Sequence, residues 1–252
     1  MKACTTRNKY RLFAICIVFL AWYLLSRIYS PLVVPPIGAV GAKIIELLSS
    51  AKMWKAVGET VFRMFIGLLL GITIGTVLGL ISGLCQSFRM TWQPIQGIIQ
   101  VVPPISWLIL AIIWFGYNGK ASIFIVVMAV VPSMTICVTD GIDAIDQKLV
   151  DMGKVFRFSF RKMLTKLYIP SVLPFFFSGL KIAIGTAAKT VVMGEVLTTT
   201  TGIGGQITNA RMNIEPETVI AWTVILVGIY FLTVMAGKLG YRLYRRVHSL
   251  RK

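Results

Sequence analysis

Residues Phe65–Leu84 read FIGLLLGITIGTVLGLISGL, a run without one charged side chain. About 20 apolar residues in a helix cross a hydrocarbon core, and a helix satisfies its backbone hydrogen bonds within the segment. A membrane barrel would instead need short strands of alternating polarity. The run therefore predicts a membrane-spanning helix and sets the fold class, an all-α membrane protein.

Comparable runs recur along the chain, which is 56% hydrophobic and only 14% charged. We expect about six transmembrane helices, at Leu12–Ile28, Thr60–Leu84, Trp92–Trp114, Ala121–Thr139, Ser171–Leu197 and Thr218–Leu239. They form one transmembrane domain, 1–252, with an N-terminal tail and first helix over 1–34, a core over 35–240 and a basic tail over 241–252. The segment Pro35–Gly58 is expected along the outer interface.

The net charge of +17 comes from bases that lie mainly at the ends of the apolar segments. There they fix orientation, so nucleic acid is not the implied partner, whereas membrane lipid is. The bias of these bases predicts a multi-pass membrane protein with both termini in the cytoplasm. The first apolar run resembles a signal peptide but lacks a cleavage site, so we expect it to be retained.

Charge is concentrated in a polar island, Asp140–Lys166, which the same orientation puts in the cytoplasm. Within it, apolar residues spaced by three and four predict an amphipathic helix from Ile142 to Phe156, with Ile145, Leu149 and Met152 on its stripe. The stripe could dock on a soluble partner or pack beneath the chain's own helix ends. Periodicity alone leaves both open.

Glycines recur at every fourth position of the second span: Gly67, Gly71, Gly75, Gly79 and Gly83. Such a strip lets another backbone approach closely. It is either a static packing seam, which we favour, or a surface along which helices slide.

Prolines and charges inside spans supply the candidates for a translocation pathway. Pro103 and Pro104 must bend or break the third apolar stretch, as a pathway element or as a simple kink. Lys189 lies deep in the fifth span, where a charge needs water or a partner, so it faces a path for an anionic or polar solute or forms a buried ion pair. Glu195 is expected to contact another helix or Arg211, and Gly202–Gly205 to form a flexible outer turn.

The sequence shows no motif for binding a metal, a cofactor or ATP. The four cysteines form no CxxC pair and His248 is the single histidine, so neither a metal site nor a cofactor is predicted. Walker-type G-x4-G-K-[ST] spacing is also lacking, which means that the chain carries no ATP site of its own. We do not expect an enzyme.

The island ends in a recognisable spacing. Asp151-Met152-Gly153, three residues, Arg157, nine residues, then Leu167-Tyr168-Ile169-Pro170 resembles Glu-Ala-Ala-x3-Gly-x9-Ile-x-Leu-Pro, the motif of binding-protein-dependent ABC importer permeases. Asp replaces Glu, Met-Gly replaces Ala-Ala, and Arg157 stands where the motif has glycine. From Pro35 to Leu239 the chain is similar to the nitrate/sulfonate/taurine branch, in Pro35-Pro36, Thr60-x-x-Arg63, Pro103-Pro104, Trp114-Phe115-Gly116, Pro170-x3-Pro174, Gly179-Leu180-Lys181, Gly194-Glu195 and Gly202-Ile203-Gly204.

This resemblance implies a type I ABC importer permease-like fold with a cytoplasmic coupling helix, in a bacterial cell (inner) membrane. It implies a homodimer that works with cytoplasmic ATP-binding subunits and an extracytoplasmic solute-binding protein. The ATPase contact would comprise Asp151, Met152, Gly153, Arg157, Leu167, Ile169 and Pro170. The implied solute is small, of the nitrate, sulfonate, taurine or bicarbonate type or a vitamin-precursor pyrimidine. The alternative is an ATP-independent secondary transporter or channel, against which stands the lack of a convincing inverted repeat.

Overall fold

The computed structural model describes the backbone of residues 2–249 and the side chains of residues 10, 13, 14 and 16–235. Lys2, Arg7, Lys9 and Arg11, the predicted basic tail (241–252) and His248 lie outside the residues whose side chains are described. Helices make up the described chain: α1 (Lys2–Ile28), α2 (Ile37–Ser49), α3 (Ala51–Leu84), α4 (Gln86–Val101), α5 (Pro104–Phe115), α6 (Gly119–Asp143), α7 (Gln147–Val155), α8 (Phe160–Met163), the π-helix η1 (Leu164–Tyr168), α9 (Ile169–Thr198), α10 (Gly202–Met212) and α11 (Pro216–Ser249).

The all-helical fold is confirmed, but the number of spans differs from about six. Among the described residues, four helices are long and apolar enough to cross a membrane: Ala51–Leu84, Gly119–Asp143, Phe160–Thr198 and Pro216–Met235. The pair α4 and α5 makes a fifth span if counted as one, although it is bent by 94°. The first predicted span appears there only as a shorter apolar helix, Cys16–Ile28.

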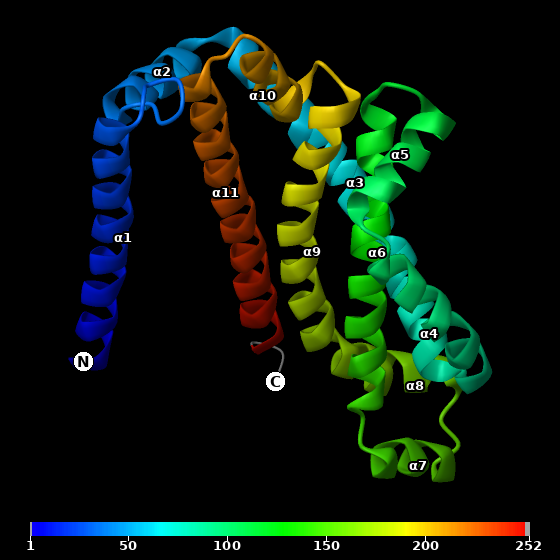
Figure 1. Cartoon of the computed structure of the whole chain (residues 1–252). Helices are drawn as coiled ribbons and strands as arrows, with labels where there is room; N and C mark the ends of the chain where they lie inside the picture. Colours follow the sequence, from blue (N-terminus) through cyan, green and yellow to red (C-terminus); the bar gives the residue numbers. More distant parts are fainter. Residues whose placement is uncertain (1, 250–252) are drawn as a thin grey trace.

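The helices run between two ends of an elongated bundle (Figure 1). We call them the α2 end, where α2 and α10 lie, and the α7 end, where α7 and α8 lie. The start of α1 and the end of α11 point toward the α7 end. The polar island, the start of α1 and the end of α11 therefore lie toward one side of the molecule (Figure 1).

The glycine strip packs against α6. A Cβ on Gly67, Gly71, Gly75, Gly79 or Gly83 would collide with Val126, Val130, Met134, Val138 or Ile142 respectively. At Gly75 it would also stand 2.8 Å from the Val131 carbonyl oxygen. Thr135 and Thr139 reinforce the contact by donating hydroxyl hydrogen bonds of 3.2 Å to the carbonyls of Gly75 and Gly79. Residue numbers rise together on both helices, so α3 and α6 lie parallel.

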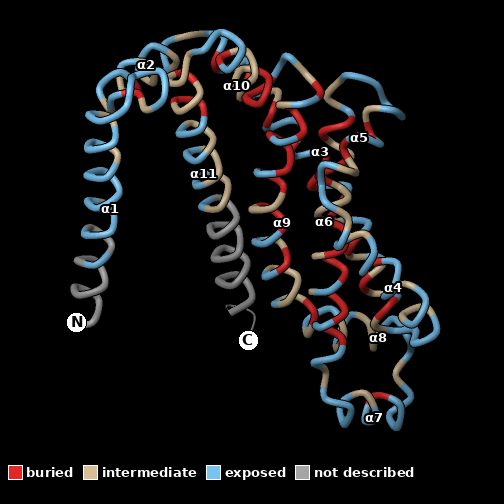
Figure 2. Tube along the Cα trace, in the orientation of Figure 1, coloured by how far each residue is buried: buried red, intermediate tan, exposed pale blue. Residues whose placement is uncertain are grey.

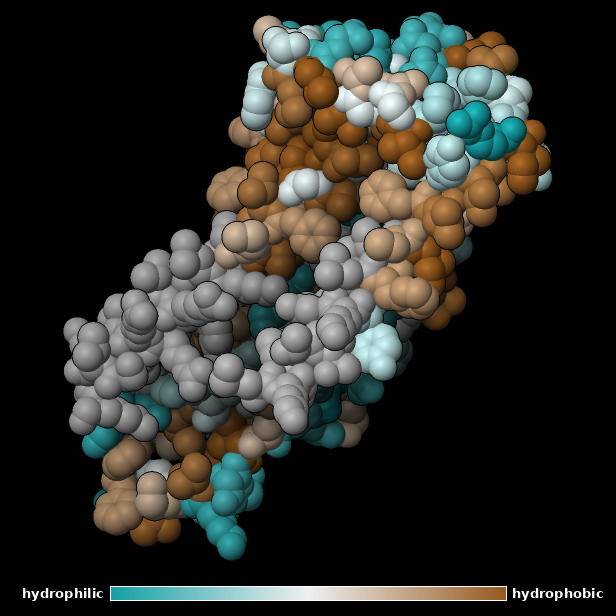
Figure 3. Space-filling model, turned by 90° about the vertical axis from the view of Figure 1, so that its left-hand side faces the viewer, coloured by the Kyte–Doolittle hydropathy of each residue, from teal (hydrophilic) through white to brown (hydrophobic). Residues whose placement is uncertain are grey.

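The core of the bundle lies where α9 packs against α3 and α6. Its buried side chains come from α3, α6 and α9: Met64, Leu68, Val126, Val130, Met134, Ala183, Ile184, Ala187, Ala188, Val191 and Val192. Figure 2 shows the buried positions concentrated along α6 and α9, whereas α1, α4 and α7 are largely exposed. On the face drawn in Figure 3, a hydrophilic cap covers the α2 end and an apolar band lies beneath it. A polar end next to an apolar band is the surface expected of a protein whose apolar band lies in the hydrocarbon core of a membrane.

Candidate functional site

Helix α7 projects beyond the bundle at one end (Figure 1) and has capped termini. Asp146 caps its start by accepting from the Lys148 amide at 2.9 Å. At its other end the Phe158 amide donates to the Gly153 carbonyl and the Arg157 amide to the Lys154 carbonyl, both at 2.9 Å. This pair of bonds is a Schellman motif, whose turning residue adopts a left-handed conformation and is usually glycine.

Arg157 is that turning residue, with φ of +49°. The position at which the family motif has glycine is therefore the position at which this turn needs a left-handed backbone. A side chain here costs about 1–2 kcal/mol of backbone strain. The glycine of the motif is thus explained by the structure: the turn needs a left-handed backbone at this position, which glycine adopts without strain.

The other motif residues in this turn have different surroundings. Gly153 is buried, and a Cβ there would collide with Met163 Sδ. Asp151 is exposed and accepts from Lys154 Nζ at 3.1 Å and Gln147 Nε2 at 3.3 Å. The hydrogen bond from Lys154, followed by that from Gln147, lowers the pKa of Asp151, which stays ionised at neutral pH. Compared with the Glu-Ala-Ala motif, this chain thus keeps a negative charge at Asp151 and a small residue at Gly153.

The predicted helix from Ile142 to Phe156 is wrong in its extent. Helix α6 continues to Asp143, and Ile142 is buried on it against Gly83. Only Gln147–Val155 is the separate helix. The apolar residues of α7 and the turn after it are not covered by their own chain: Leu149 is 45% exposed, Met152 48%, Val155 79% and Phe156 68%. Of the two alternatives, packing beneath the chain's own helix ends is excluded for these four side chains.

The end of the motif forms the entry into α9. Leu167 lies in the π-helix and is half-buried, whereas Ile169 and Pro170 are exposed at the first residues of α9. The Ile169 amide donates to the Leu164 carbonyl, one residue farther back than in an α-helix. Helix α8 and this π-turn thus join the exposed turn after α7 to α9, the helix that carries Lys189.

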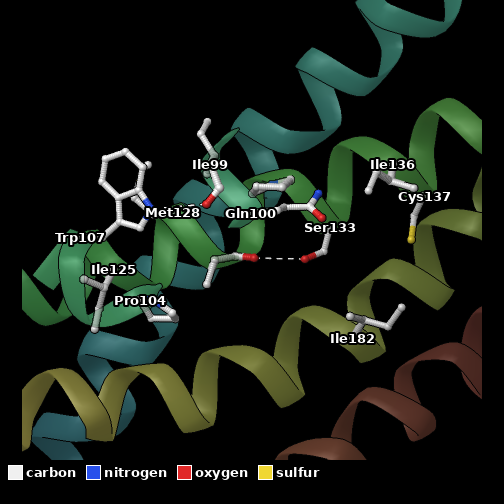
Figure 4. A pocket seen from close by; sticks show the side chains of 12 residues that line it. Ile99, Gln100, Pro104, Trp107, Ile125, Met128, Ser133, Ile136, Cys137 and Ile182 are labelled. Atoms are coloured by element: carbon white, nitrogen blue, oxygen red, sulfur yellow. Dashed lines mark hydrogen bonds between the residues drawn. The ribbon is translucent and has the colours of Figure 1, made fainter. Parts of the chain in front are cut away.

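Pro103 and Pro104 break the third apolar stretch completely, since α4 ends at Val101 and α5 begins at Pro104. Pro103 cannot donate to the Ile99 carbonyl, which a continuous helix would require. Instead Trp107 Nε1 donates to that carbonyl at 3.3 Å (Figure 4). The freed Ile99 carbonyl therefore stays satisfied, as backbone groups at membrane depth must.

A cavity of about 380 Å³ lies beside this break (Figure 4). Its lining is mostly apolar, with Ser133 and Gln100 as polar groups: Ile99, Gln100, Pro104, Trp107, Ile125, Met128, Ala129, Pro132, Ser133, Ile136, Cys137 and Ile182. Ser133 Oγ donates to the Ala129 carbonyl at 3.0 Å. Helices α4, α5, α6 and α9 all contribute to this lining, α9 through the face that carries Ile182.

Lys189 lies on that face of α9. It is exposed, and it is separated by seven residues, two helical turns, from the cavity residue Ile182. Its ammonium forms no ion pair with any side chain that the structure describes. The alternative of a buried ion pair within the chain is therefore wrong for Lys189.

Glu195, in contrast, is fully buried at the α2 end and paired. Its carboxylate accepts from Arg63 Nη1 at 2.7 Å, Thr60 Oγ1 at 2.8 Å and the Gly204 amide at 3.0 Å. Its partner is thus Arg63 of α3, so the expected contact with another helix is confirmed and the alternative contact with Arg211 is wrong. Because no surface of Glu195 is exposed, the structure gives it a structural role and removes it from the pathway candidates.

Gly202–Gly205 also differs from its prediction. These residues are the buried first turn of α10, not a flexible turn. Gly202 adopts φ of +80°, and Cβ atoms at Gly202 or Gly204 would clash with the Glu195 side chain. Arg63 reaches the same turn, donating to Thr201 Oγ1 at 2.7 Å and to the Thr201 carbonyl at 3.2 Å. The glycines make room for a buried acid.

Two structural contacts were not predicted from the sequence, the Arg63–Glu195 pair and the Trp107 hydrogen bond. A signal existed for the first, because a buried arginine and a buried glutamate in different spans each need a partner of opposite charge. The second could not be read from spacing alone, since it depends on the direction of the chain after the proline break.

The chain was compared with known proteins. Residues 67–247 match the family model described as binding-protein-dependent transport system inner membrane component. The taurine transport system permease protein TauC of Escherichia coli K12 is 24% identical over 239 residues, which cover 92% of this chain and 86% of that protein. The bicarbonate transport system permease protein CmpB of Synechocystis sp. is 35% identical over 130 residues, 51% of this chain and 46% of that protein.

Among solved structures, a chain of a bacterial ABC transporter involved in the import of alginate superposes with a TM-score of 0.67. The superposition covers 94% of this chain and 96% of that chain, at 16% sequence identity. A likeness at this identity concerns the fold alone.

Proposed function

This chain belongs to the family of binding-protein-dependent transport system inner membrane components, and from this premise we propose how it works in an ABC importer for a small anionic solute. It is the transmembrane permease subunit and not an enzyme, because ATP hydrolysis belongs to a separate subunit in this family. The proposal concerns its partners, its pathway and its solute.

The observation that carries the proposal is α7. It stands outside the bundle with Leu149, Met152, Val155 and Phe156 exposed. Removal of such apolar side chains from water lowers the free energy, so an exposed cluster of them favours a binding partner. A groove on a cytoplasmic ATP-binding subunit would cover them. The coupling contact then comprises Asp151, Met152, Gly153 and Arg157, with Leu167, Ile169 and Pro170 at the entry into α9. The α7 end, with both chain termini, is cytoplasmic.

Motion of the ATP-binding subunits would enter the bundle through this contact. When two such subunits close on ATP, they shift α7, and the turn and π-helix that follow carry the shift to α9. Since Lys189 is on α9, access to its face would switch between the two sides of the membrane.

Lys189 supports a permease homodimer that encloses a pathway. An ammonium exposed to lipid in the middle of a span costs about 3 kcal/mol even on the lenient insertion scale. The face of α9 that carries Lys189 is therefore expected to meet water and a second copy of the chain. Pro103 and Pro104, beside the cavity on the same face, would line that pathway. A positive charge there favours an anion, and taurine and bicarbonate are named for two relatives.

An extracytoplasmic binding protein would deliver the solute at the α2 end. A second cavity of about 260 Å³ lies there between α2, α10 and the start of α3, with charged and amide side chains in its lining, among them Lys43, Glu46, Lys52, Gln206 and Asn209. Such polar surface is typical of a contact that forms and separates in each cycle.

Reconstitution tests the proposal against an ATP-independent transporter or channel. Proteoliposomes that contain this chain, the cognate ATP-binding subunit and the binding protein should accumulate radiolabelled taurine or bicarbonate only with ATP. The double variant Met152→Asp/Phe156→Asp should lose co-purification of the ATP-binding subunit, because both changes bury charge in the contact. Leu48→Asp, at an exposed apolar position of α2, is the matched control and should keep it. Uptake without nucleotide, or unchanged co-purification of the double variant, would refute the proposal.

A further inference from the structure

Arg157 keeps a charged side chain at the turn after α7, where glycine would be free of strain. Its φ of +49° is the left-handed conformation that a Cβ makes costly. The side chain is nevertheless exposed, so burial in the protein's own core does not offset that strain. Strained residues persist where the surrounding structure or a function requires them. The exposed guanidinium is therefore a candidate for a contact with another molecule.

The described part of the protein offers this guanidinium no partner. It takes part in no ion pair and lies over no aromatic ring among the residues that the structure describes. The two nearest carboxylates along the chain are already engaged, since Asp146 caps the start of α7 and Asp151 accepts from Lys154 Nζ at 3.1 Å. The nearby ring of Phe158 holds another cation, with Lys162 Nζ 4.0 Å from its centroid. A partner for the guanidinium is therefore expected outside this chain.

The dipole of α7 does not account for the arginine. A cation near the C-terminal end of a helix is favourable, but the effect falls off within the last turn. Lys154 already places a cation in the last turn of α7. A second cation at a strained position gains little from the same field. The positive charge of Arg157 thus has no stabilising role within the described part of the chain.

The surface around Arg157 is both apolar and basic. Val155 and Phe156, the two residues before it, are 79% and 68% exposed. Residues 146–166 include six basic and two acidic side chains, so this surface has an excess of positive charge. Arginine and aromatic side chains are enriched among the residues that contribute most to protein–protein binding, and opposite charges on two partners favour the specific complex. The composition favours a protein partner that has an apolar groove with acidic side chains beside it.

We propose that the Arg157 guanidinium pairs with a carboxylate beside the groove of the ATP-binding subunit that receives α7. The inference rests on the proposed function and adds to it the chemistry of the partner surface. A planar guanidinium donates two parallel hydrogen bonds to a carboxylate, and the apolar side chains of α7 would exclude water around this pair. The pair makes the permease selective for its partner. An ATP-binding subunit that lacks the carboxylate would leave the guanidinium desolvated and unpaired.

Binding of the detergent-solubilised chain to its cognate ATP-binding subunit tests the pair. Arg157→Gln removes the charge but keeps a Cβ, and it should raise the Kd by about thirtyfold or more, the effect of truncating one partner of a close charge pair. Arg157→Lys keeps the charge without the planar fork and should give an intermediate Kd. Arg161→Gln is the matched control, because Arg161 is an exposed arginine of α8 that forms no ion pair with the described residues. It should change the Kd by less than about twofold. Equal effects of Arg157→Gln and Arg161→Gln, or an unchanged Kd in Arg157→Gln, would refute a specific pair.

Stability separates a contact with the partner from a structural role. Arg157→Gln should keep the melting temperature of the original chain, since both residues have a Cβ in the left-handed turn. Arg157→Gly should raise the melting temperature through relief of strain and yet bind the ATP-binding subunit as weakly as Arg157→Gln. A merely structural arginine would move stability and binding in the same direction. Tight binding by the stabilised glycine variant would contradict the pair.

Charge reversal identifies the carboxylate. Arg157→Glu should lose binding, and a single Asp→Lys or Glu→Lys change beside the groove of the ATP-binding subunit should restore it. That ATP-binding variant should in turn bind the unchanged permease poorly. If no acidic position beside the groove restores binding in this way, the guanidinium has no partner carboxylate and the proposal is wrong.

A lipid partner and a failure of the proposed function give different results. In nanodiscs, the effect of Arg157→Gln should be the same in phosphatidylcholine alone and in a mixture with phosphatidylglycerol. An effect that needs the anionic lipid would place Arg157 on the membrane surface and overturn the pair. If Met152→Asp/Phe156→Asp also leaves the Kd unchanged, the proposed function itself fails. Loss of binding in that double variant, together with unchanged binding of Arg157→Gln, rules out only the charge pair.

Discussion

Among the described residues, two that are not glycine have a left-handed backbone, and they end helices at opposite ends of the molecule. Arg157 turns the chain after α7, and Ile214, with φ of +58°, turns it after α10. In both turns the amide of the next residue donates a hydrogen bond to a carbonyl of the preceding helix. Phe158 donates to Gly153 and Glu215 to Ala210, each with an N···O distance of 2.9 Å. A β-branched residue in this conformation is unusual. Strain of this kind often lies where function constrains a turn.

Replacement of Arg157 by glycine should stabilise the protein. Relief of left-handed strain outweighs the greater freedom of glycine in the unfolded chain, so Arg157→Gly should raise the free energy of unfolding by about 0.5–1 kcal/mol. Arg157→Ala is the control and should bring no gain, because alanine keeps the Cβ. Thermal unfolding in detergent measures both. Equal stability of the two variants would contradict the left-handed turn.

The pair Arg63–Glu195 is the buried charge contact that ties α3, α9 and the start of α10 together. Arg63→Met leaves the Glu195 carboxylate buried without its cation, which should lower the free energy of unfolding by about 3–5 kcal/mol. The double variant Arg63→Met/Glu195→Gln should recover part of this loss, since glutamine still accepts from Thr60 and Gly204 without a charge. A double-mutant cycle in detergent measures the coupling. Strictly additive effects would contradict a direct pair.

At the scale of elements, the parallel seam between α3 and α6 depends on the absence of side chains. Gly75→Ala adds a methyl group against Met134 and the Val131 carbonyl, and overpacking of this kind costs about 1–3 kcal/mol. Gly228→Ala in α11 meets nothing within 4 Å. It should gain up to about 1 kcal/mol, because alanine favours a helix. Gly75→Ala should therefore lower the melting temperature and Gly228→Ala should raise it. If both variants changed it in the same direction, close packing at Gly75 would be contradicted.

The sequence predicted the elements better than their partners. Four apolar runs, the glycine strip and the disruption at Pro103 could be read from it, because hydrophobic length and missing amides act locally. The division between α6 and α7 could not, since the apolar spacing from Ile142 to Phe156 continues across the break at Asp146. The sequence did indicate that Glu195 needs a cationic partner, but only tertiary packing decides between Arg63 and Arg211. Of the pathway candidates, Lys189 and the two prolines remain proposals.

At the scale of the whole molecule, one face of the bundle carries the Lys189 ammonium, which no side chain in the described part of the protein neutralises. Lys189→Gln should leave the subunit as stable as before, since the side chain is exposed and forms no ion pair with the described residues. The same change should lower ATP-dependent uptake of taurine or bicarbonate by about tenfold or more, through loss of attraction for an anion. Lys189→Arg keeps the charge and should retain most uptake. A destabilised Lys189→Gln subunit, or one with full uptake, would contradict a pathway position.

The regular pairing of the α3–α6 seam also bears on how the protein is made. The same number of chain positions separates the two partners in every pair, from Gly67 with Val126 to Gly83 with Ile142. All five pairs therefore close a loop of one size, and the entropy of that closure is lost once for the whole seam. A nascent chain cannot begin the seam until α4 and α5 have returned across the membrane and α6 has emerged. Assembly of the subunit should thus be delayed until that moment and then proceed turn by turn along the glycines.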